Sequence, residues 1–231
     1  MRSLDSAEQP ATQAGCRLLV VNPNGNPAVT ELVRGTAERI LSPGTIAKVV
    51  NPRGSPLSIE TADERRKAEP LALDLLAAHP DFDAYVMACF DDIAVETGRR
   101  LLNASVVDTV VAAIAAVRLV AERFAVITTV ENAVPGINAR MATLGMAGRC
   151  FVHAAGVSVA AAADASTAVA DRIDEAIHIA RCRDGVEAIV LGSGGLIGRA
   201  PQLAFRHGLP VIDAIEAALV LAESMALQRS R

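Results

Sequence analysis

The segment DAYVMACFDD (residues 83–92) has the pattern of a buried strand that ends in a cysteine and two carboxylates. A second segment, EAIVLGSGGL (187–196), repeats this pattern at an offset of 187 − 83 = 104 residues, so that Ser193 corresponds to Cys89. Ligands of open α/β sheets bind at the carboxyl ends of the strands, which makes both positions candidate site residues. A cysteine that only fills space in the core is the competing interpretation.

The same offset recurs at two further places. SVVDTVVAAIAAV (105–117) resembles PVIDAIEAALVLA (210–222) at an offset of 105, and RLLVVN (17–22) resembles RFAVIT (123–128) at an offset of 106. Chance similarity between apolar strands is the alternative explanation. A nearly constant offset favours an internal duplication and therefore two similar lobes.

Apolar runs of strand length alternate with helical patterns along the chain. The predicted strands are 17–22, 45–51, 83–88, 104–108, 123–128, 149–155, 186–192 and 209–213, with helices at 27–41 and around 61–78. Strands separated by helices pair in parallel. We therefore predict an α/β fold of two pseudo-symmetric lobes, each with a parallel four-stranded sheet flanked by helices, and an active site in the cleft between them.

The predicted domain division is a disordered leader at 1–15, a first lobe at 16–110 that the C-terminal segment 209–231 completes, and a second lobe at 111–208. The leader lacks the apolar core of a signal peptide. The most continuous apolar stretch, 109–121, is short for a membrane span and contains Arg118. We expect a cytoplasmic protein that does not enter a membrane.

Composition excludes several classes of function. The net charge is −4 and the chain has no basic run, which argues against nucleic-acid binding. The four cysteines form no CxxC pair, and the four histidines lack metal-ligand spacing, so that we expect neither a disulfide framework nor a metal site. We further expect a small-molecule substrate and a homo-oligomer.

Six segments carry a resemblance to a known family: VVNPNGN (20–26), SPLSIE (55–60), DAYVMACFDD (83–92), FAVITT (124–129), AIVLGSGG (188–195) and LPVIDAIEAA (209–218). In this order they resemble the aspartate/glutamate/hydantoin racemase superfamily, particularly its hydantoin and allantoin racemase branch. The resemblance covers nearly the whole chain after the leader.

That resemblance implies a racemase or epimerase that needs no cofactor and acts on a small cyclic substrate, a 5-substituted hydantoin or an allantoin-like ring. Two cysteines of the family flank the stereogenic carbon; one removes its proton and the other returns a proton to the opposite face. Thiols suit this task because their pKa can be brought near ambient pH. By motif, Cys89 matches the first family cysteine, whereas the second falls at Ser193.

The serine is a departure with consequences, because a hydroxyl is far less acidic than a thiol. Three explanations stay open: a deliberate Cys-to-Ser replacement that traps substrate, a natural decarboxylase or isomerase that uses one cysteine, and a catalytically impaired homologue that only binds a small molecule. The family pattern CFGDPG is CFDDIA (89–94) here, and GIAEA is DTVVA (108–112). The second change removes an acidic residue and leaves Val110 and Val111 near the cleft.

Six residues beside the catalytic pair are predicted to bind the substrate: Asn24, Phe90, Thr128, Thr129, Gly194 and Gly195. Polar side chains after the first strand and its repeat could orient a polar ring, although Asn24 could instead cap a helix. The glycine N–H groups could bind a carbonyl that becomes enolate-like, or they could belong to an ordinary tight turn.

Four aspartates receive structural interpretations. Carboxylates beside a thiolate raise its pKa, so we interpret Asp91 and Asp92 as helix caps or solvated loop charges. Asp108 and Asp213 occupy equivalent places in the repeat and are predicted to be N-caps of paired helices.

Overall fold

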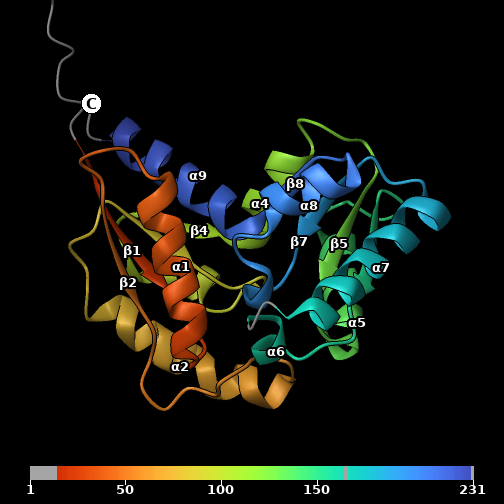
Figure 1. Cartoon of the computed structure of the whole chain (residues 1–231). Coiled ribbons are helices and arrows are strands. Elements are labelled where there is room, and N and C mark those ends of the chain that lie inside the picture. Colours follow the sequence, from red (N-terminus) through yellow and green to blue (C-terminus); the bar gives the residue numbers. More distant parts are fainter. Residues whose placement is uncertain (1–14, 164–165, 230–231) are drawn as a thin grey trace, which may run out of the picture.

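The computed structural model describes residues 15–163 and 166–229, and it contains two α/β lobes that lie side by side (Figure 1). The strand order is β2-β1-β3-β4 in the first sheet and β6-β5-β7-β8 in the second, and every pairing is parallel. The predicted fold class is confirmed. Of the expected leader, residues 1–14 lie outside the described residues.

The first sheet has helices on both faces. Its elements are β1 (Arg17–Val21), α1 (Pro27–Ile40), β2 (Ile46–Val50), α2 (Ala62–Ala77), β3 (Ala84–Met87), α3 (Val95–Leu101) and β4 (Ser105–Asp108). Side chains of a strand alternate between faces. Leu18 and Val20 accordingly pack on the side of α1, whereas Leu19 and Val21 pack with α2 and α3.

The second lobe repeats this arrangement. Its elements are β5 (Phe124–Thr128), η1 (Glu131–Ala133), α5 (Val134–Thr143), β6 (Cys150–Ala154), α6 (Val159–Ala163), α7 (Thr167–Asp184), β7 (Ala188–Leu191), η2 (Gly194–Leu196), α8 (Ala200–His207) and β8 (Val211–Asp213). Ala125 and Ile127 pack with α7 and α8, and Phe124 and Val126 pack on the opposite face with α5.

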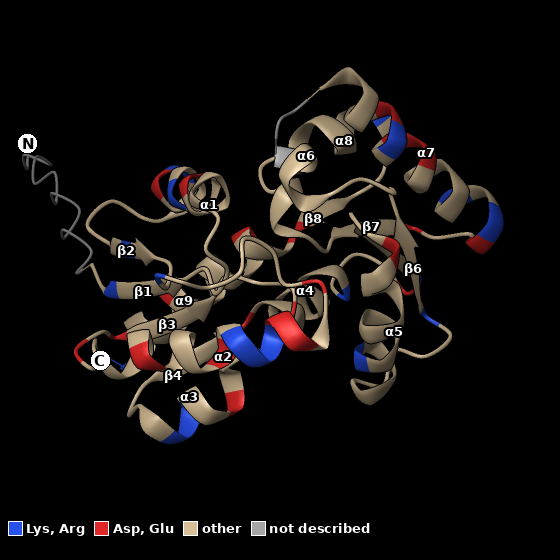
Figure 2. Cartoon of the chain, turned by 90° about the horizontal axis from the view of Figure 1, so that it is seen from below, with Lys and Arg blue, Asp and Glu red and all other residues tan. Residues whose placement is uncertain are grey.

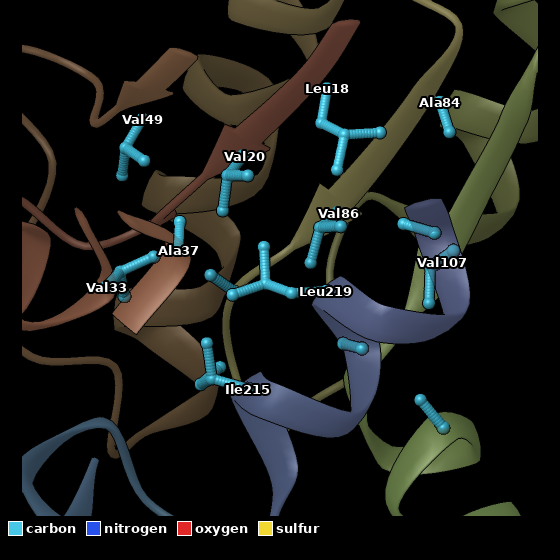
Figure 3. Close-up of a cluster of buried hydrophobic side chains, with 14 of the residues drawn as sticks. Leu18, Val20, Val33, Ala37, Val49, Ala84, Val86, Val107, Ile215 and Leu219 are labelled. Carbon is cyan, nitrogen blue, oxygen red and sulfur yellow. The ribbon is translucent and has the colours of Figure 1, made fainter. Parts of the chain in front are cut away.

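Two helices pass from one lobe to the other. Helix α4 (Thr109–Val117) follows β4 of the first sheet, yet Ala113 and Val117 pack against β5 and β7 of the second. Helix α9 (Ala214–Arg229) follows β8, yet Ile215 and Leu219 pack on the first sheet (Figure 3). This exchange joins the two hydrophobic cores.

The segment 209–231 is therefore divided between the sheets. Strand β8 pairs with β7 in the second sheet, whereas α9 covers the first. Strand β8 lies at the edge of the second sheet, next to β7. The domain division itself remains a prediction.

The two crossing helices begin with equivalent caps, as predicted. Asp108 Oδ1 accepts hydrogen bonds from the N–H groups of Val110 (2.8 Å) and Val111 (3.2 Å). Asp213 Oδ1 accepts from Ile215 (2.9 Å) and from Glu216 (3.3 Å). These bonds satisfy N–H groups that the first turn of a helix leaves without partners.

Charge is concentrated on the outer helices, whereas most of the sheet interior is uncharged (Figure 2). Within residues 15–163 and 166–229, no helix is long and apolar enough to cross a membrane.

Candidate active site

A cavity of about 480 Å³ opens between the lobes at the carboxyl ends of the strands. Seven of the eight predicted site residues line it: Asn24, Cys89, Phe90, Thr128, Thr129, Ser193 and Gly194. Its volume lies within the range of small-molecule sites. The cleft expected from the repeat is therefore present, and its walls come from both lobes.

Cys89 and Ser193 occupy equivalent positions. Strand β3 ends at Met87 and strand β7 at Leu191, so that each candidate residue follows its strand by two positions. Both side chains are half-buried and both line the cavity. The duplication of the backbone thus presents a thiol and a hydroxyl to one space.

The surroundings of Cys89 favour the neutral thiol. Burial raises the pKa of Cys89 to about 12; the positive charge of Arg65 acts in the opposite direction, and the carboxylate of Asp108 adds to the increase. At neutral pH the thiol of Cys89 is therefore protonated. To act as a base it must first lose its proton.

The hydroxyl of Ser193 belongs to a small hydrogen-bonded group. Its Oγ lies 3.0 Å from Oγ1 of Thr129, and it accepts a hydrogen bond from the N–H of Gly195 at 3.4 Å. Thr129 is almost completely buried, which limits the orientations that this pair can adopt. The second-lobe wall thus presents a fixed hydroxyl group rather than an ionisable thiol.

Asn24 contributes a donor to the cavity. Its Oδ1 accepts hydrogen bonds from Asn22 Nδ2 (3.0 Å) and from the N–H of Asn26 (2.9 Å), which orients the amide. Its Nδ2 makes no hydrogen bond within the described part of the chain. The helix cap of α1 is Asn26, whose side chain accepts from the N–H of Ala28 (3.0 Å), so the capping interpretation of Asn24 is wrong.

The glycines of the second strand end have different roles. Gly195 does not line the cavity, contrary to its predicted place; a Cβ there would lie 2.6 Å from the carbonyl oxygen of Val159, so the residue permits close packing on α6. A Cβ at Gly192 would lie 2.4 Å from Val126 and 3.1 Å from Phe90. Of the predicted glycines, Gly194 alone is in place to face a ligand.

The carboxylates after β3 are paired, and neither caps α3. Asp91 and Asp92 both form ion pairs with Arg65, and Asp92 also pairs with Arg140 at 3.2 Å. Helix α3 begins after Ala94 without a side-chain cap. The interpretation of these aspartates as helix caps is therefore wrong. Their side chains are 33% and 39% exposed, so they are partly solvated, but they also pair with arginines from other helices.

One wall of the cavity is apolar. It is formed by Val110 at the start of α4, Ala133 of η1, and Ile137 and Met141 of α5, which belong to the core of the second lobe. Val111, expected near the cleft, is not part of the lining and is 38% exposed. Sequence reasoning missed the α5 residues because nothing in their helical pattern distinguishes a cavity wall from a core face.

No group of three or more histidine, cysteine, aspartate or glutamate side chains within residues 15–163 and 166–229 could hold a metal ion.

A cleft between two pseudo-symmetric α/β lobes, with a cysteine and a serine at equivalent strand ends, is the arrangement that the resemblance to the racemases implies. The family model of the Asp/Glu/hydantoin racemases matches residues 18–222. A hydantoin racemase from Paenarthrobacter aurescens is 33% identical over 90% of each chain.

Solved structures agree with this match. The allantoin racemase from Klebsiella pneumoniae superposes with a TM-score of 0.88 at 31% identity and covers 93% of this chain and 89% of its own. The allantoin racemase from Pseudomonas fluorescens gives 0.86 at 33% identity, with coverages of 93% and 91%. The chain belongs to the Asp/Glu/hydantoin racemase family and is an isomerase of the racemase type.

Proposed function

We propose that the protein is a cofactor-independent racemase or epimerase of a small neutral ring, with Cys89 as the acid–base group on one face and Ser193 on the other. The observation that carries this proposal is the equivalent position of the two side chains at strand ends that line one cavity. A ring held between them would have its stereogenic carbon exposed to both.

The charge of the lining favours a neutral substrate. Two arginines, Arg65 and Arg140, face three carboxylates, Glu60, Asp91 and Asp92, which leaves a net charge of −1. Both arginines already pair with carboxylates, so that neither is free to bind an anion. The carboxylate of an amino-acid substrate would gain little electrostatic stabilisation from this lining. An uncharged hydantoin ring would not be repelled by its negative charge.

The apolar wall favours an apolar substituent on that ring. Val110, Ile137 and Met141 offer no hydrogen-bonding group to the ureido arm of an allantoin-like substrate, which would be desolvated without compensation. A hydrocarbon substituent would instead gain from burial. We therefore favour a 5-substituted hydantoin over an allantoin-like ring.

The proposed chemistry is unequal on the two faces. Once deprotonated, Cys89 removes the proton from the stereogenic carbon, and the electron pair moves to the adjacent carbonyl oxygen. Nδ2 of Asn24 and the backbone near Gly194 are in place to stabilise that oxygen. Cys89 can return a proton to the same face, whereas return by Ser193 would leave an alkoxide. Exchange should therefore be faster than inversion.

A single-cysteine decarboxylase is the alternative. The protonated state of Cys89 suits it, since a thiol would donate its proton to the carbanion left after loss of carbon dioxide. The net negative lining opposes it, because its substrate must carry a carboxylate. A homologue that binds a ring without turnover is the third possibility.

The test is proton NMR in heavy water with each enantiomer of a 5-benzyl hydantoin. We expect one enantiomer to exchange its C5 proton for deuterium faster than it inverts. Cys89→Ala should abolish enzyme-dependent exchange, whereas Cys182→Ala, which changes an exposed thiol outside the cavity, should not. Loss of carbon dioxide from a substituted malonate without hydantoin exchange would favour the decarboxylase, and binding without exchange would favour the third possibility.

Cytoplasmic location and assembly as a homo-oligomer remain part of the proposal.

A further inference from the structure

An ion-pair group joins the two lobes, and two of its members, Arg140 and Asp92, line the cavity on the side that we call its mouth. Arg140, on α5 of the second lobe, reaches Asp92 with Nη1 (3.2 Å) and Asp108 with Nη2 (2.8 Å), and both carboxylates belong to the first lobe. We call these three residues the interlobe clamp. Arg65 of the first lobe also holds Asp92, at 2.8 Å, so that one carboxylate is shared by an arginine from each lobe.

We infer that Arg140 is a positioning residue, which sets the separation of the cleft walls by fixing the loop that carries Cys89 to the second lobe. Asp92 follows Cys89 by three residues in that loop. The guanidinium on α5 thus acts on the thiol through Asp92. It holds the loop at one distance from the wall that bears Ser193.

The side chains suit this task. A guanidinium presents a rigid planar fork, so Arg140 can bind two carboxylates at once, which a lysine ammonium cannot do with the same geometry. The carboxylate of Asp108 is 1% exposed and is further fixed by the first turn of α4. Arg140 is therefore held by the fixed carboxylate of Asp108, and in that position its Nη1 reaches Asp92.

The two halves of the clamp differ in exposure. The side chain of Asp92 is 39% exposed, whereas that of Asp108 is nearly buried. Surface ion pairs are weak and are screened by salt, whereas buried pairs are costly to break. The Arg140–Asp92 pair is consequently the half that can open, and its breakage would widen the mouth while the lobes remain joined at Asp108.

Helix α2 carries charged residues of both signs (Figure 2). One of its arginines, Arg65, pairs with Asp92 and keeps it in position when Arg140 releases it. The loop would then remain folded with the mouth open, so that entry of a ligand does not require disorder of the loop that carries Cys89.

The experiment measures access to Cys89 with two thiol reagents, small iodoacetamide and bulky fluorescein maleimide, and takes the ratio of the bulky to the small rate. Both reagents attack the thiolate, so a change in the pKa of Cys89 affects both rates and largely cancels in the ratio. We expect Asp92→Asn to raise the ratio about threefold, the scale of one partly exposed ion pair. High salt should raise it in the unchanged protein as well.

Asp91→Asn is the matched control. It removes the same charge at nearly the same distance along the chain from Cys89. Within the described residues, however, the ion-pair partner of Asp91 is Arg65 of its own lobe, with no arginine of the second lobe. The ratio of the bulky to the small labelling rate should be the same in this variant as in the unchanged protein. Arg140→Lys should give an intermediate ratio, because an ammonium keeps the positive charge but lacks the rigid planar fork that binds both carboxylates at once. Cys182, exposed on α7, provides the internal reference in every sample.

The inference is wrong if Asp92→Asn and Arg140→Lys leave the ratio unchanged, or if Asp91→Asn raises it equally, since the effect would then come from charge alone. The measurement needs no substrate, so that its outcome is independent of the proposed racemase activity. With a substrate in hand, loosening of the clamp should lower kcat more than it changes KM, and Arg140→Lys should lower kcat less than Asp92→Asn does.

Discussion

The residues that follow β3 and β7 occupy equivalent positions but carry different chemical groups. Each places a side chain two positions after its strand and in the same cavity, yet Cys89 is an ionisable thiol and Ser193 a hydroxyl held by Thr129. Duplication of an α/β lobe can thus supply the symmetry that two-faced proton transfer requires. Whether both faces react depends on a single side chain.

The largest effect expected from this comparison comes from Ser193→Cys, which makes the two strand ends chemically equivalent. General acid–base groups contribute roughly 10²–10⁴-fold each, so inversion of a 5-substituted hydantoin should increase by that order. Polarimetry would follow inversion, and NMR in heavy water would follow exchange. Exchange should change far less, because Cys89 already supports it.

Thr129→Val is a useful companion to this change. It removes the hydroxyl that binds Ser193 while it keeps the shape of the side chain. A Ser193→Cys protein that folds and keeps a reactive Cys89, yet inverts neither hydantoin enantiomer, would contradict the racemase proposal.

The second prediction uses the pH dependence of alkylation to test whether burial raises the pKa of Cys89. Since the pKa of Cys89 is raised to about 12, only the neutral thiol is populated near pH 7, and the thiolate fraction grows about tenfold for each pH unit below that value. Iodoacetamide labelling of Cys89 should therefore rise by about this factor per unit from pH 7 to 10. If the labelling rate, measured by mass spectrometry, stops rising near pH 8, burial does not set the pKa of Cys89.

Sequence reasoning found the duplicated framework because its signals are local. The apolar runs at 83–88 and 186–192 fix the strand ends, and the offset of 104 between them pairs Cys89 with Ser193 without reference to any contact. The strands themselves are shorter than predicted, Ala84–Met87 and Ala188–Leu191, because apolar residues continue beyond the last paired residue.

The arginines of the cleft could not be found in this way. Arg65 lies on α2 and Arg140 on α5, each in an ordinary helical pattern, and their partners are 26 to 48 residues away along the chain. An aspartate that follows a strand looks the same in sequence whether it is solvated or paired. Packing of two lobes, rather than local propensity, decides which charges meet.

The third prediction compares the two helix caps that the duplication places at Asp108 and Asp213. The second oxygen of Asp108 binds Arg140, whereas that of Asp213 accepts the N–H of Gly198 at 2.7 Å. Asp108→Asn loses a charge-assisted bond at a buried site and should cost about 2–3 kcal/mol of unfolding free energy.

Asp213→Asn should cost only about 1 kcal/mol, the value of one hydrogen bond. Burial raises the pKa of Asp213, so removal of its charge also removes a burial penalty and offsets part of the loss. Urea denaturation at pH 7 measures both variants. Equal losses at the two sites would mean that the Arg140 pair adds nothing to stability.

The smallest effect concerns the loops that follow the two strand ends. At the offset of 104, Ala94 corresponds to Gly198, and both adopt left-handed backbone conformations, with φ of 61° and 80°. For a residue with a Cβ this conformation costs roughly 1–2 kcal/mol, and glycine adopts it freely. A Cβ at Gly198 would meet no atom within 4 Å, so Gly198→Ala tests the backbone cost without a steric clash. Because alanine also reduces the entropy of the unfolded chain by about 0.4–1 kcal/mol, the net destabilisation should be about 0.5–1 kcal/mol.

The reverse change at Ala94 should be nearly neutral, because three terms offset one another. Ala94→Gly relieves the backbone strain, but it removes a methyl group that is 1% exposed, worth about 0.8 kcal/mol. It also adds about 0.4–1 kcal/mol of conformational entropy to the unfolded chain. We expect a change of less than about 0.5 kcal/mol in thermal or urea unfolding. A stabilisation well above this would mean that the first-lobe loop stores strain that its methyl group does not offset, whereas a large loss would show that packing of Ala94 dominates.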